Sequence, residues 1–380
     1  MHRPTDGEKE ALWKAFAEGR APRPPVLWSC NVRIVLLDPA LNTGGWTAEA
    51  YWRDPAATIA AQLAYRDYMC DVVHRHSDKP TALPERWGVF ADTQTVHDGC
   101  YFGGELGFPE GQVAAQKPFL RADDAEAFLA MEFDPETNPF LQAQYARRDA
   151  IAKAARGLAH RGRPLEAEMP IWNTDGPVTL GMELFGEDFL LLLADEDSGL
   201  ADRLMEKFVR DTVRRNRYMR RRAGQPERVS GELCLSDDSV QLISTEMLRK
   251  RVLPMHHLYH EESSLPGAKR TTHLCGNATR HFKTLADELG VCSFDTGFPV
   301  DHGALRRELG PDVVIRGGPR VSFFTDGTPA EVAAETRRIL YSGVTEGGRF
   351  ILGEGNNMPP RVSEANLAAA YGEALAFAGC

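Results

Sequence analysis

Residues 269–296 read KRTTHLCGNATRHFKTLADELGVCSFDT and place two short runs on either side of a helical pattern. The runs, 269–275 and 291–296, have the length of strands, and the apolar residues between them recur at helical spacing. Parallel strands need a crossover of this kind, because a two-residue hairpin joins only antiparallel strands. The stretch therefore predicts one strand–helix–strand unit of a parallel sheet.

The same alternation continues on both sides of this stretch. Further strand-like runs are expected at 166–172, 228–235, 313–317 and 349–353, and helical patterns at 189–222, 245–260, 303–309 and 329–341. Thr328 and Pro329 followed by Glu331 are typical of a helix start. Six repeats in one register, without a Gly-x-Gly-x-x-Gly motif, favour an α/β fold of the (β/α)8 TIM-barrel type over a dinucleotide-binding sheet.

The predicted organisation is a single barrel domain over residues 1–380. Residues 1–165 are rich in Trp, Pro and Asp, and we assign them to an N-terminal elaboration with the first barrel strands. Residues 166–380 form the regular strand–helix repeats. A chain of 380 residues suits a barrel with such an addition.

Composition excludes several classes of protein. The net charge of −10 disfavours a nucleic-acid partner, because binding to duplexes needs a dominant basic surface. No stretch approaches the roughly 18 apolar residues of a membrane helix. Seven scattered cysteines suggest a reducing compartment, and the charged N-terminal pattern MHRPTDGEKEALWKAF predicts an amphipathic helix rather than a secretory signal. We expect a cytoplasmic protein.

One local exception is the arginine-rich run 210–228. We expect these arginines to lie on the solvated face of a long helix. The alternative is a docking patch for an acidic partner protein.

In a TIM barrel the active site lies at the C-terminal ends of the strands, so the residues that end each run are the candidates for chemistry. These ends are 172–175, 235–238, 273–277, 294–297, 316–319 and 353–357, and they are rich in Asp, Asn, Gly, His and Cys. Glycine allows the backbone to approach a ligand closely. We assign cofactor binding to Asn277, Gly317, Gly318 and Asn356.

His273 and Cys275 stand two residues apart, so both side chains point to the same face of their strand. An imidazole and a thiolate at this spacing suit a zinc ion, although a packed pair without metal is equally consistent with the spacing. Zinc needs at least a third protein ligand. Glu354 is the first choice for it, with Asp238, Glu232 and Asp295 in reserve.

Asp237 and Asp238 are the candidate catalytic acids. Either carboxylate suits a cation or a general base, and the alternative role is to cap the helix that follows. His256 and His260 share one face of a predicted helix, but no third ligand accompanies them in the sequence. We therefore expect them to be surface histidines.

An ordered series of segments in the C-terminal half resembles the uroporphyrinogen decarboxylase superfamily. The segments are 176–180 with 184–186, 237–239, 243–244, 253–254, 273–277, 300–301, 317–318, 327–332, 350–353 and Asn366. The resemblance covers about residues 165 to 375 and implies a (β/α)8 barrel.

Within the superfamily the sequence departs from the classical decarboxylases. Their N-terminal Arg-Gln-Ala-Gly-Arg-type segment is not found, and residues 24–33 read PPVLWSCNVR instead. The pair His273 and Cys275 looks like the zinc site of the corrinoid-dependent methyltransferases. In that group zinc deprotonates a thiol, which attacks a cobalt-bound methyl group. The group's later Cys position corresponds here to Asn356, so either Glu354 takes over as ligand or the metal site is altered.

The leading hypothesis is therefore a zinc-dependent methyltransferase that moves a methyl group between a corrinoid and a small acceptor. The chain has no Asp-x-His-x-x-Gly signature, so the resemblance implies cobalamin that is free or carried by a separate corrinoid protein. One alternative is a metal-independent decarboxylase or lyase, with Arg33 or Arg316 holding a substrate carboxylate. Another is a non-catalytic barrel that binds a tetrapyrrole. The sequence leaves the oligomeric state open.

Overall fold

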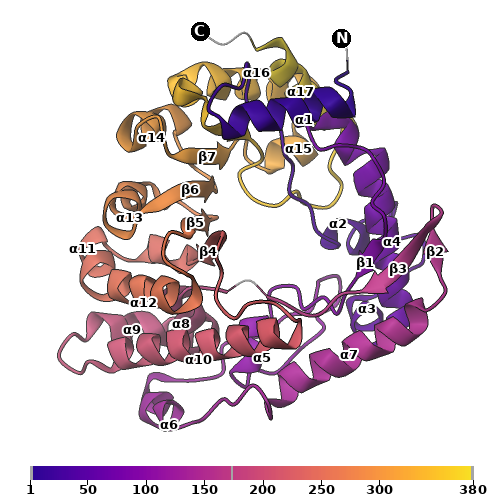
Figure 1. Cartoon of the computed structure of the whole chain (residues 1–380). Helices are drawn as coiled ribbons and strands as arrows, with labels where there is room; N and C mark the ends of the chain where they lie inside the picture. Colours follow the sequence, from indigo (N-terminus) through magenta and orange to yellow (C-terminus); the bar gives the residue numbers. More distant parts are fainter. Residues whose placement is uncertain (1–2, 173, 378–380) are drawn as a thin grey trace. The chain divides into compact units, whose positions relative to one another are not determined.

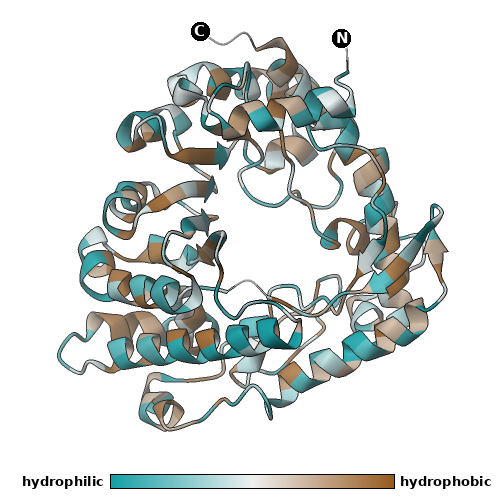
Figure 2. Cartoon of the chain, in the orientation of Figure 1, coloured by the Kyte–Doolittle hydropathy of each residue, from teal (hydrophilic) through white to brown (hydrophobic). Residues whose placement is uncertain are grey.

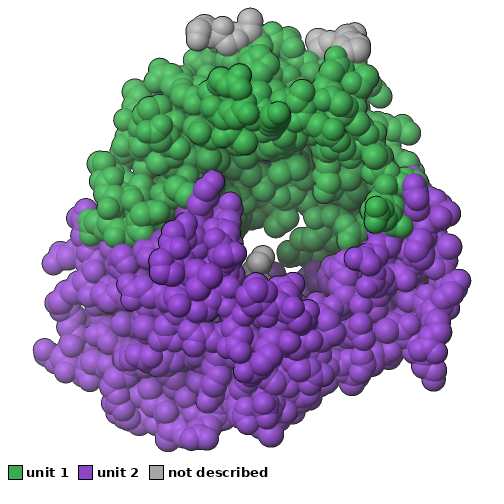
Figure 3. Space-filling view, in the orientation of Figure 1, with its two compact units in different colours: residues 1–45, 60–85, 273–380 green, residues 46–59, 86–272 purple. Residues whose placement is uncertain are grey.

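The computed structural model describes residues 3–172 and 174–377 (Figure 1), so Asn173, within one of the expected strand ends, lies outside the described residues. The chain divides into two compact units (Figure 3). Unit 1 comprises residues 1–45, 60–85 and 273–380, and unit 2 comprises residues 46–59 and 86–272.

Unit 1 is built on parallel strands. β6 (Val291–Thr296), β7 (Val314–Gly317) and β8 (Phe350–Leu352) pair with Phe294 beside Ile315 and Ile315 beside Phe350. The end of β5 (Lys269–Leu274) joins β6, because the Gly297 N–H donates to the Leu274 carbonyl at 2.7 Å. On the other edge, Val26 forms a parallel bridge with Leu352. The Leu27 N–H donates to the Leu352 carbonyl and the Leu352 N–H to the Pro25 carbonyl, both at 2.9 Å, so the run 25–28 (PVLW) lies along the edge of β8.

Helices cover these strands in unit 1. They are α1 (Asp6–Ala17), α2 (Arg33–Leu36), η1 (Val73–His76), η5 (Thr279–His281), α13 (Phe282–Leu289), α14 (His302–Leu309), α15 (Ser322–Asp326), α16 (Pro329–Ile339), η6 (Leu340–Val344), η7 (Glu346–Gly348) and α17 (Glu364–Ala376), with α4 (Pro55–Asp71) beginning in unit 2. The predicted start of α16 is confirmed, because Thr328 and Glu331 form a reciprocal capping box.

Unit 2 holds the remaining strands. β4 (Glu232–Ser236) lies beside the first part of β5, where the Thr272 hydroxyl donates to the Leu235 carbonyl at 2.6 Å. β1 (Trp87–Val89) pairs in parallel with β3 (Arg163–Ala167), and β2 (Ala159–His160) pairs with β3 in antiparallel fashion. In the larger sheet, hydrogen-bonded neighbours follow the order β4-β5-β6-β7-β8.

The helices of unit 2 are α3 (Ala48–Arg53), α5 (His97–Tyr101), η2 (Ala122–Asp124), α6 (Ala125–Leu129), α7 (Pro139–Ala155), α8 (Pro177–Phe185), α9 (Asp188–Ala194), α10 (Leu200–Arg222), η3 (Asp238–Leu242), α11 (Thr245–Met247), η4 (Leu248–Val252) and α12 (Leu253–Ser263). Hydrophilic and hydrophobic segments alternate along α10 (Figure 2). Its apolar face buries Leu204, Phe208 and Val213, as expected of an amphipathic helix.

The predicted elements differ from the observed ones at three places. The strand expected at 228–235 begins only at Glu232, as β4. The run 166–172 was expected to be a strand, but β3 ends at Ala167, where its pairing with β1 ends. The pattern 189–222 is two helices, because α9 ends at Ala194 and α10 begins only after Gly199, whose φ of 62° lies in the left-handed region outside helical geometry. Among the residues described, no helix combines the length and the hydropathy needed to cross a membrane.

Candidate functional site

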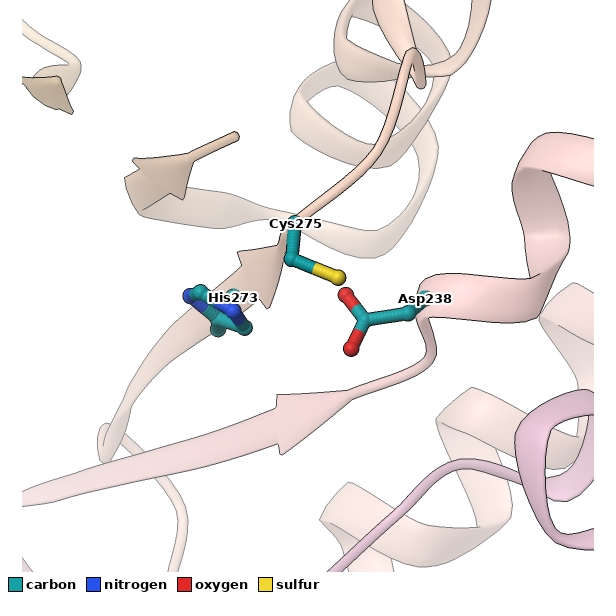
Figure 4. Close-up of side chains that lie close together, drawn as sticks. All are labelled: Asp238, His273 and Cys275. Atoms are coloured by element: carbon teal, nitrogen blue, oxygen red, sulfur yellow. The ribbon is translucent and has the colours of Figure 1, made fainter. Parts of the chain in front are cut away.

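Two of the predicted metal ligands, His273 and Cys275, stand where β5 ends. His273 belongs to the strand and Cys275 follows it by one residue (Figure 4). Both side chains are half-buried, and a ring nitrogen of His273 lies within 4.8 Å of the Cys275 sulfur. The alternation of side chains along an extended chain explains why residues two apart reach the same side.

A series of ionic contacts continues from His273 across the next strand ends of unit 1. His273 Nδ1 is 2.9 Å from Asp295 Oδ2, at the end of β6. The same carboxylate oxygen lies 3.6 Å from Arg316 Nη1 on β7, and Arg316 Nη2 lies 3.2 Å from Glu354 Oε1 beyond β8. Asp295, a reserve ligand in the sequence analysis, thus contacts the histidine itself.

Glu354 is almost fully buried at 2% exposure. The Ser29 N–H, at the end of run 25–28, donates to both of its carboxylate oxygens at 3.1 Å. Burial raises the pKa of Glu354 to about 8, against the opposing effects of the Arg316 charge and the Ser29 N–H. The predicted third ligand is therefore a buried carboxyl held by Arg316 and Ser29, with a raised pKa.

The predicted cofactor-binding positions serve several local purposes. The Asn277 side chain accepts a hydrogen bond from the Thr279 hydroxyl at 2.9 Å, and Asn356 accepts one from the Asn357 N–H at 2.7 Å. A Cβ atom at Gly317 would collide with His302 and Thr296, and one at Gly318 would collide with the Gly353 carbonyl. The two glycines allow close packing of the strand ends.

In unit 2, Asp237 follows β4 and is 1% exposed. Its Oδ1 accepts hydrogen bonds from the Thr179 N–H at 2.8 Å and the Thr179 hydroxyl at 2.9 Å, and its Oδ2 lies 2.8 Å from His256 Nε2. Asp237, a candidate catalytic acid, therefore binds the first turn of α8, which precedes it in the chain, and not the helix that follows, whose capping was its alternative role. Asp238 begins η3 and is half-buried (Figure 4).

The prediction that His256 and His260 are surface residues is wrong. Their exposures are 3% and 1%, because the face of α12 that carries them packs inward. Burial, and then the nearby His256, lower the pKa of His260 to about 3. The sequence pattern of α12 is polar on several sides, which is why it gave no signal of burial.

Sequence reasoning missed a buried ion pair of unit 2. Asp98 on α5 and Arg215 on α10 are both fully buried and hydrogen-bonded to each other. The guanidinium also lies over the rings of Tyr101 and Trp172, at 5.1 and 5.2 Å from their centroids. Only the arginine-rich character of α10 hinted at this pair.

Several arginines of the run 210–228 form ion pairs with acidic residues of unit 2, although we expected a solvated face. Arg210 and Arg217 contact Glu262, Arg214 contacts Asp211, and Arg221 contacts Glu227. Ion pairs near the surface add little stability individually. Because acidic side chains neutralise these arginines, less positive charge is left for an acidic partner protein than the sequence suggested.

Comparisons with known proteins identify the fold. The family model described as uroporphyrinogen decarboxylase (URO-D) matches residues 100–374. A methyltransferase from Methanosarcina mazei has a similar structure, with a TM-score of 0.62, 14% identity, and coverage of 98% of this chain and 99% of that one. A putative vitamin-B12-independent methionine synthase from Listeria monocytogenes matches with a TM-score of 0.33 and 16% identity, over 62% of this chain and 66% of that one. No curated protein matches the sequence.

These findings confirm the expected fold class, an α/β fold of the TIM-barrel type. The matched segment includes β4 to β8, both candidate aspartates, and the His273–Cys275 pair. This chain belongs to the uroporphyrinogen decarboxylase family.

Proposed function

We propose that the protein is a zinc-dependent methyltransferase that moves a methyl group between a corrinoid and a small acceptor. The observation that carries the proposal is the contact of His273 Nδ1 with the Asp295 carboxylate, with Cys275 two residues further along. Histidines that bind metals commonly donate their other ring N–H to a carboxylate, which fixes the tautomer and orients the ring. Membership of the family and the fold shared with a methyltransferase are consistent with this role.

The residues present fit zinc. Imidazole, thiolate and carboxylate are the ligands that zinc takes in proteins, and a site that keeps one position open for a substrate uses three protein ligands. We assign His273 and Cys275 as two of them and Glu354 as the third, with Asp238, the first residue of η3, in reserve. Bound zinc would lower the pKa of a thiol acceptor and orient it.

The chain's own residues have distinct tasks in this proposal. Asp295 holds the ring of His273, and Arg316 compensates the negative charge of Asp295 and of Glu354. We keep Asp237 and Asp238 as the candidate catalytic acids, and Asp237 is also hydrogen-bonded to the first turn of α8 and to His256. Asn277, Gly317, Gly318 and Asn356 would line the side of the site that a corrinoid approaches, whether free or on a partner protein.

The lyase alternative receives less support from the geometry. Arg316 was its candidate anchor for a substrate carboxylate, but its guanidinium already donates to the Leu27 carbonyl, the Ser29 hydroxyl and Glu354. Arg33 donates from Nε to the Asn31 side chain at 3.2 Å. A substrate carboxylate would have to displace these partners. Release of carbon dioxide from a candidate acid would nevertheless favour this alternative.

The decisive experiment is metal content by elemental analysis of the purified chain. We expect about one zinc per chain in the wild type, and its loss in both His273→Ala and Cys275→Ala. Cys292→Ala, a half-buried cysteine on β6, is the matched control and should keep the metal. Glu354→Gln and Asp238→Asn decide the remaining ligand. Metal retained in both the His273 and Cys275 variants would overturn the assignment.

If zinc is present, the second measurement is demethylation of methylcobalamin with small thiols, followed by the change in corrin absorbance. His273→Ala and Cys275→Ala should lower the rate together with the zinc content. Turnover of methylcobalamin by these variants at the wild-type rate would contradict the proposed role of the zinc.

A further inference from the structure

Unit 2 contains a pocket of about 410 Å³ that the proposed zinc chemistry does not use. Part of its wall is apolar, formed by Val96, Ala114 and Met182. The polar part includes Gln116, Thr179 and Glu183. Glu183 is the one lining residue that carries a formal charge when ionised. The pocket therefore offers a ligand an apolar surface and a single acidic group.

Glu183 is only partly satisfied by its surroundings. The Gly99 N–H donates a hydrogen bond to its carboxylate. Its Oε2 atom is buried and receives no hydrogen bond from the residues that the structure describes. A buried acceptor without a donor is costly, which makes such an atom a marker for a missing ligand or water.

The charges around Glu183 do not balance. Asp98 and Asp175 lie close enough to act on its ionisation, whereas Arg215 is the cation that acts on all three carboxyls and is hydrogen-bonded to Asp98. Burial, and then the charges of Asp98 and Asp238, raise the pKa of Asp175 well above its ordinary value. Burial, and then Asp175 and Asp98, do the same to the pKa of Glu183. Among the described residues, Arg215 is thus the cation shared by three neighbouring carboxyl groups, and it is already paired with Asp98.

From the pocket, the unpartnered carboxylate oxygen and the excess of acidic groups, we propose that unit 2 binds a small primary ammonium ion with an apolar chain. The N–H groups of the ligand donate to Glu183 Oε2, and its carbon chain packs against Val96, Ala114 and Met182. An ammonium fits better than a neutral amide or alcohol, because it supplies both the donor and the missing charge. The inference does not depend on the proposed zinc site.

A divalent metal is the competing occupant. His97, Asp98 and Asp175 offer ligand atoms within 4.8 Å of one another. Asp98 is already bound by Arg215, and its Oδ2 accepts a hydrogen bond from the Asp175 N–H at 3.0 Å. A dication placed on these ligands would also stand beside a guanidinium. The organic cation at Glu183 avoids this repulsion.

The test compares binding of n-propylammonium with that of 1-propanol, its uncharged counterpart, to the full chain. The readout is the ¹³C-methyl signal of methionine, with Met182→Leu used to assign the Met182 signal, and potassium chloride as the salt control. We expect the Met182 signal to shift with saturation by the ammonium, and at least tenfold weaker binding of the alcohol. Glu183→Gln should weaken ammonium binding at least tenfold, and Glu187→Gln, at an exposed glutamate just before α9, should not.

Equal binding of the ammonium and the alcohol by the wild type would overturn the proposal, and so would binding that survives in a folded Glu183→Gln variant. Binding of Mn²⁺ that excludes the ammonium would assign the site to a metal instead. Because the wild-type comparison alone decides charge selectivity, the test stands even if Glu183→Gln fails to fold. His273→Ala should bind the ammonium normally, which separates this result from the fate of the zinc proposal.

Discussion

The contact between His273 and Asp295 links the sequence of this protein to its proposed chemistry at the level of single residues. The carboxylate lies 2.9 Å from Nδ1, so the other ring nitrogen, Nε2, is the one assigned to the metal. An Asp in this position raises the basicity of the imidazole and fixes its plane. The orientation of the ligand thus depends on a residue of the next strand.

Asp295→Asn should weaken zinc binding by about tenfold or more, because the amide keeps the size of the carboxylate and loses its charge. Competition with a chromophoric chelator measures the zinc affinity directly. Asp312→Asn, at an exposed aspartate just before β7, is the control and should bind zinc as the wild type does. An unchanged affinity in Asp295→Asn would argue against a supporting role for this carboxylate.

For single residues, the sequence predicted positions that depend on a short local stretch and missed contacts between residues far apart in the chain. His273, Cys275, Asp237 and Glu354 could be placed at strand ends, since a strand end is visible in a short stretch of sequence. The pairing of Asp98 with Arg215 could not be predicted, because 117 residues separate the two partners. No spacing rule relates residues that far apart.

Among the elements, α8 depends most clearly on a side chain from elsewhere. Its N-cap residue, Gly176, has no side chain, and the N–H groups of the first turn donate to Asp237 instead. A Cβ atom at position 176 would collide with the Asp237 carboxyl. The Asp237 carboxylate can therefore cap α8 only because the N-cap position holds glycine.

Asp237→Ala should destabilise the fold by about 3 kcal/mol, because it leaves buried donors of α8 and His256 without an acceptor. Asp237→Asn keeps one carbonyl oxygen and should cost less. Urea unfolding followed by circular dichroism gives both values. Equal stability of the wild type and Asp237→Ala would show that these hydrogen bonds contribute nothing net.

The elements were predicted correctly where the hydrophobic periodicity and the residues that begin or end an element agree. β6 has the predicted bounds, residues 291–296, and α16 begins after its predicted N-cap residue, Thr328. The prediction of one helix over 189–222 was wrong because the segment 195–199, which ends in Gly199, interrupts the amphipathic pattern between α9 and α10. Residues 1–165 gave no regular pattern, because their strands are as short as β1 and long connections separate them.

For the molecule as a whole, buried histidines shape the dependence of stability on pH. Burial lowers the pKa of His260 to about 3, and the pKa values of His74 and His302 to about 4. These groups stay neutral in the native state, while unfolded histidines gain a proton below about pH 6.5. Their contribution to stability is present above pH 6.5 and is lost as the pH falls toward 4 and then 3.

His260→Leu isolates this effect, because neither ring nitrogen of His260 forms a hydrogen bond within the described structure. Between pH 7.5 and 5.5 the wild type should lose about 1.4 kcal/mol relative to the variant. Acids with raised pKa values, such as Glu354 at about 8, act in the opposite direction, but they are present in both proteins and cancel in the difference. Urea titrations at the two pH values provide the test, and a difference independent of pH would contradict it.

The hydrogen bonds between Ser29 and Glu354 can form only late in the synthesis of the chain. The two residues are 325 positions apart, and the backbone N–H of one serves the buried carboxylate of the other. At translation rates of about 5–20 residues per second, Ser29 waits on the order of tens of seconds before Glu354 has been synthesised. During that interval a nascent chain lacks β8, so the run 25–28 has no strand to pair with and its apolar residues remain available to chaperones or to aggregation.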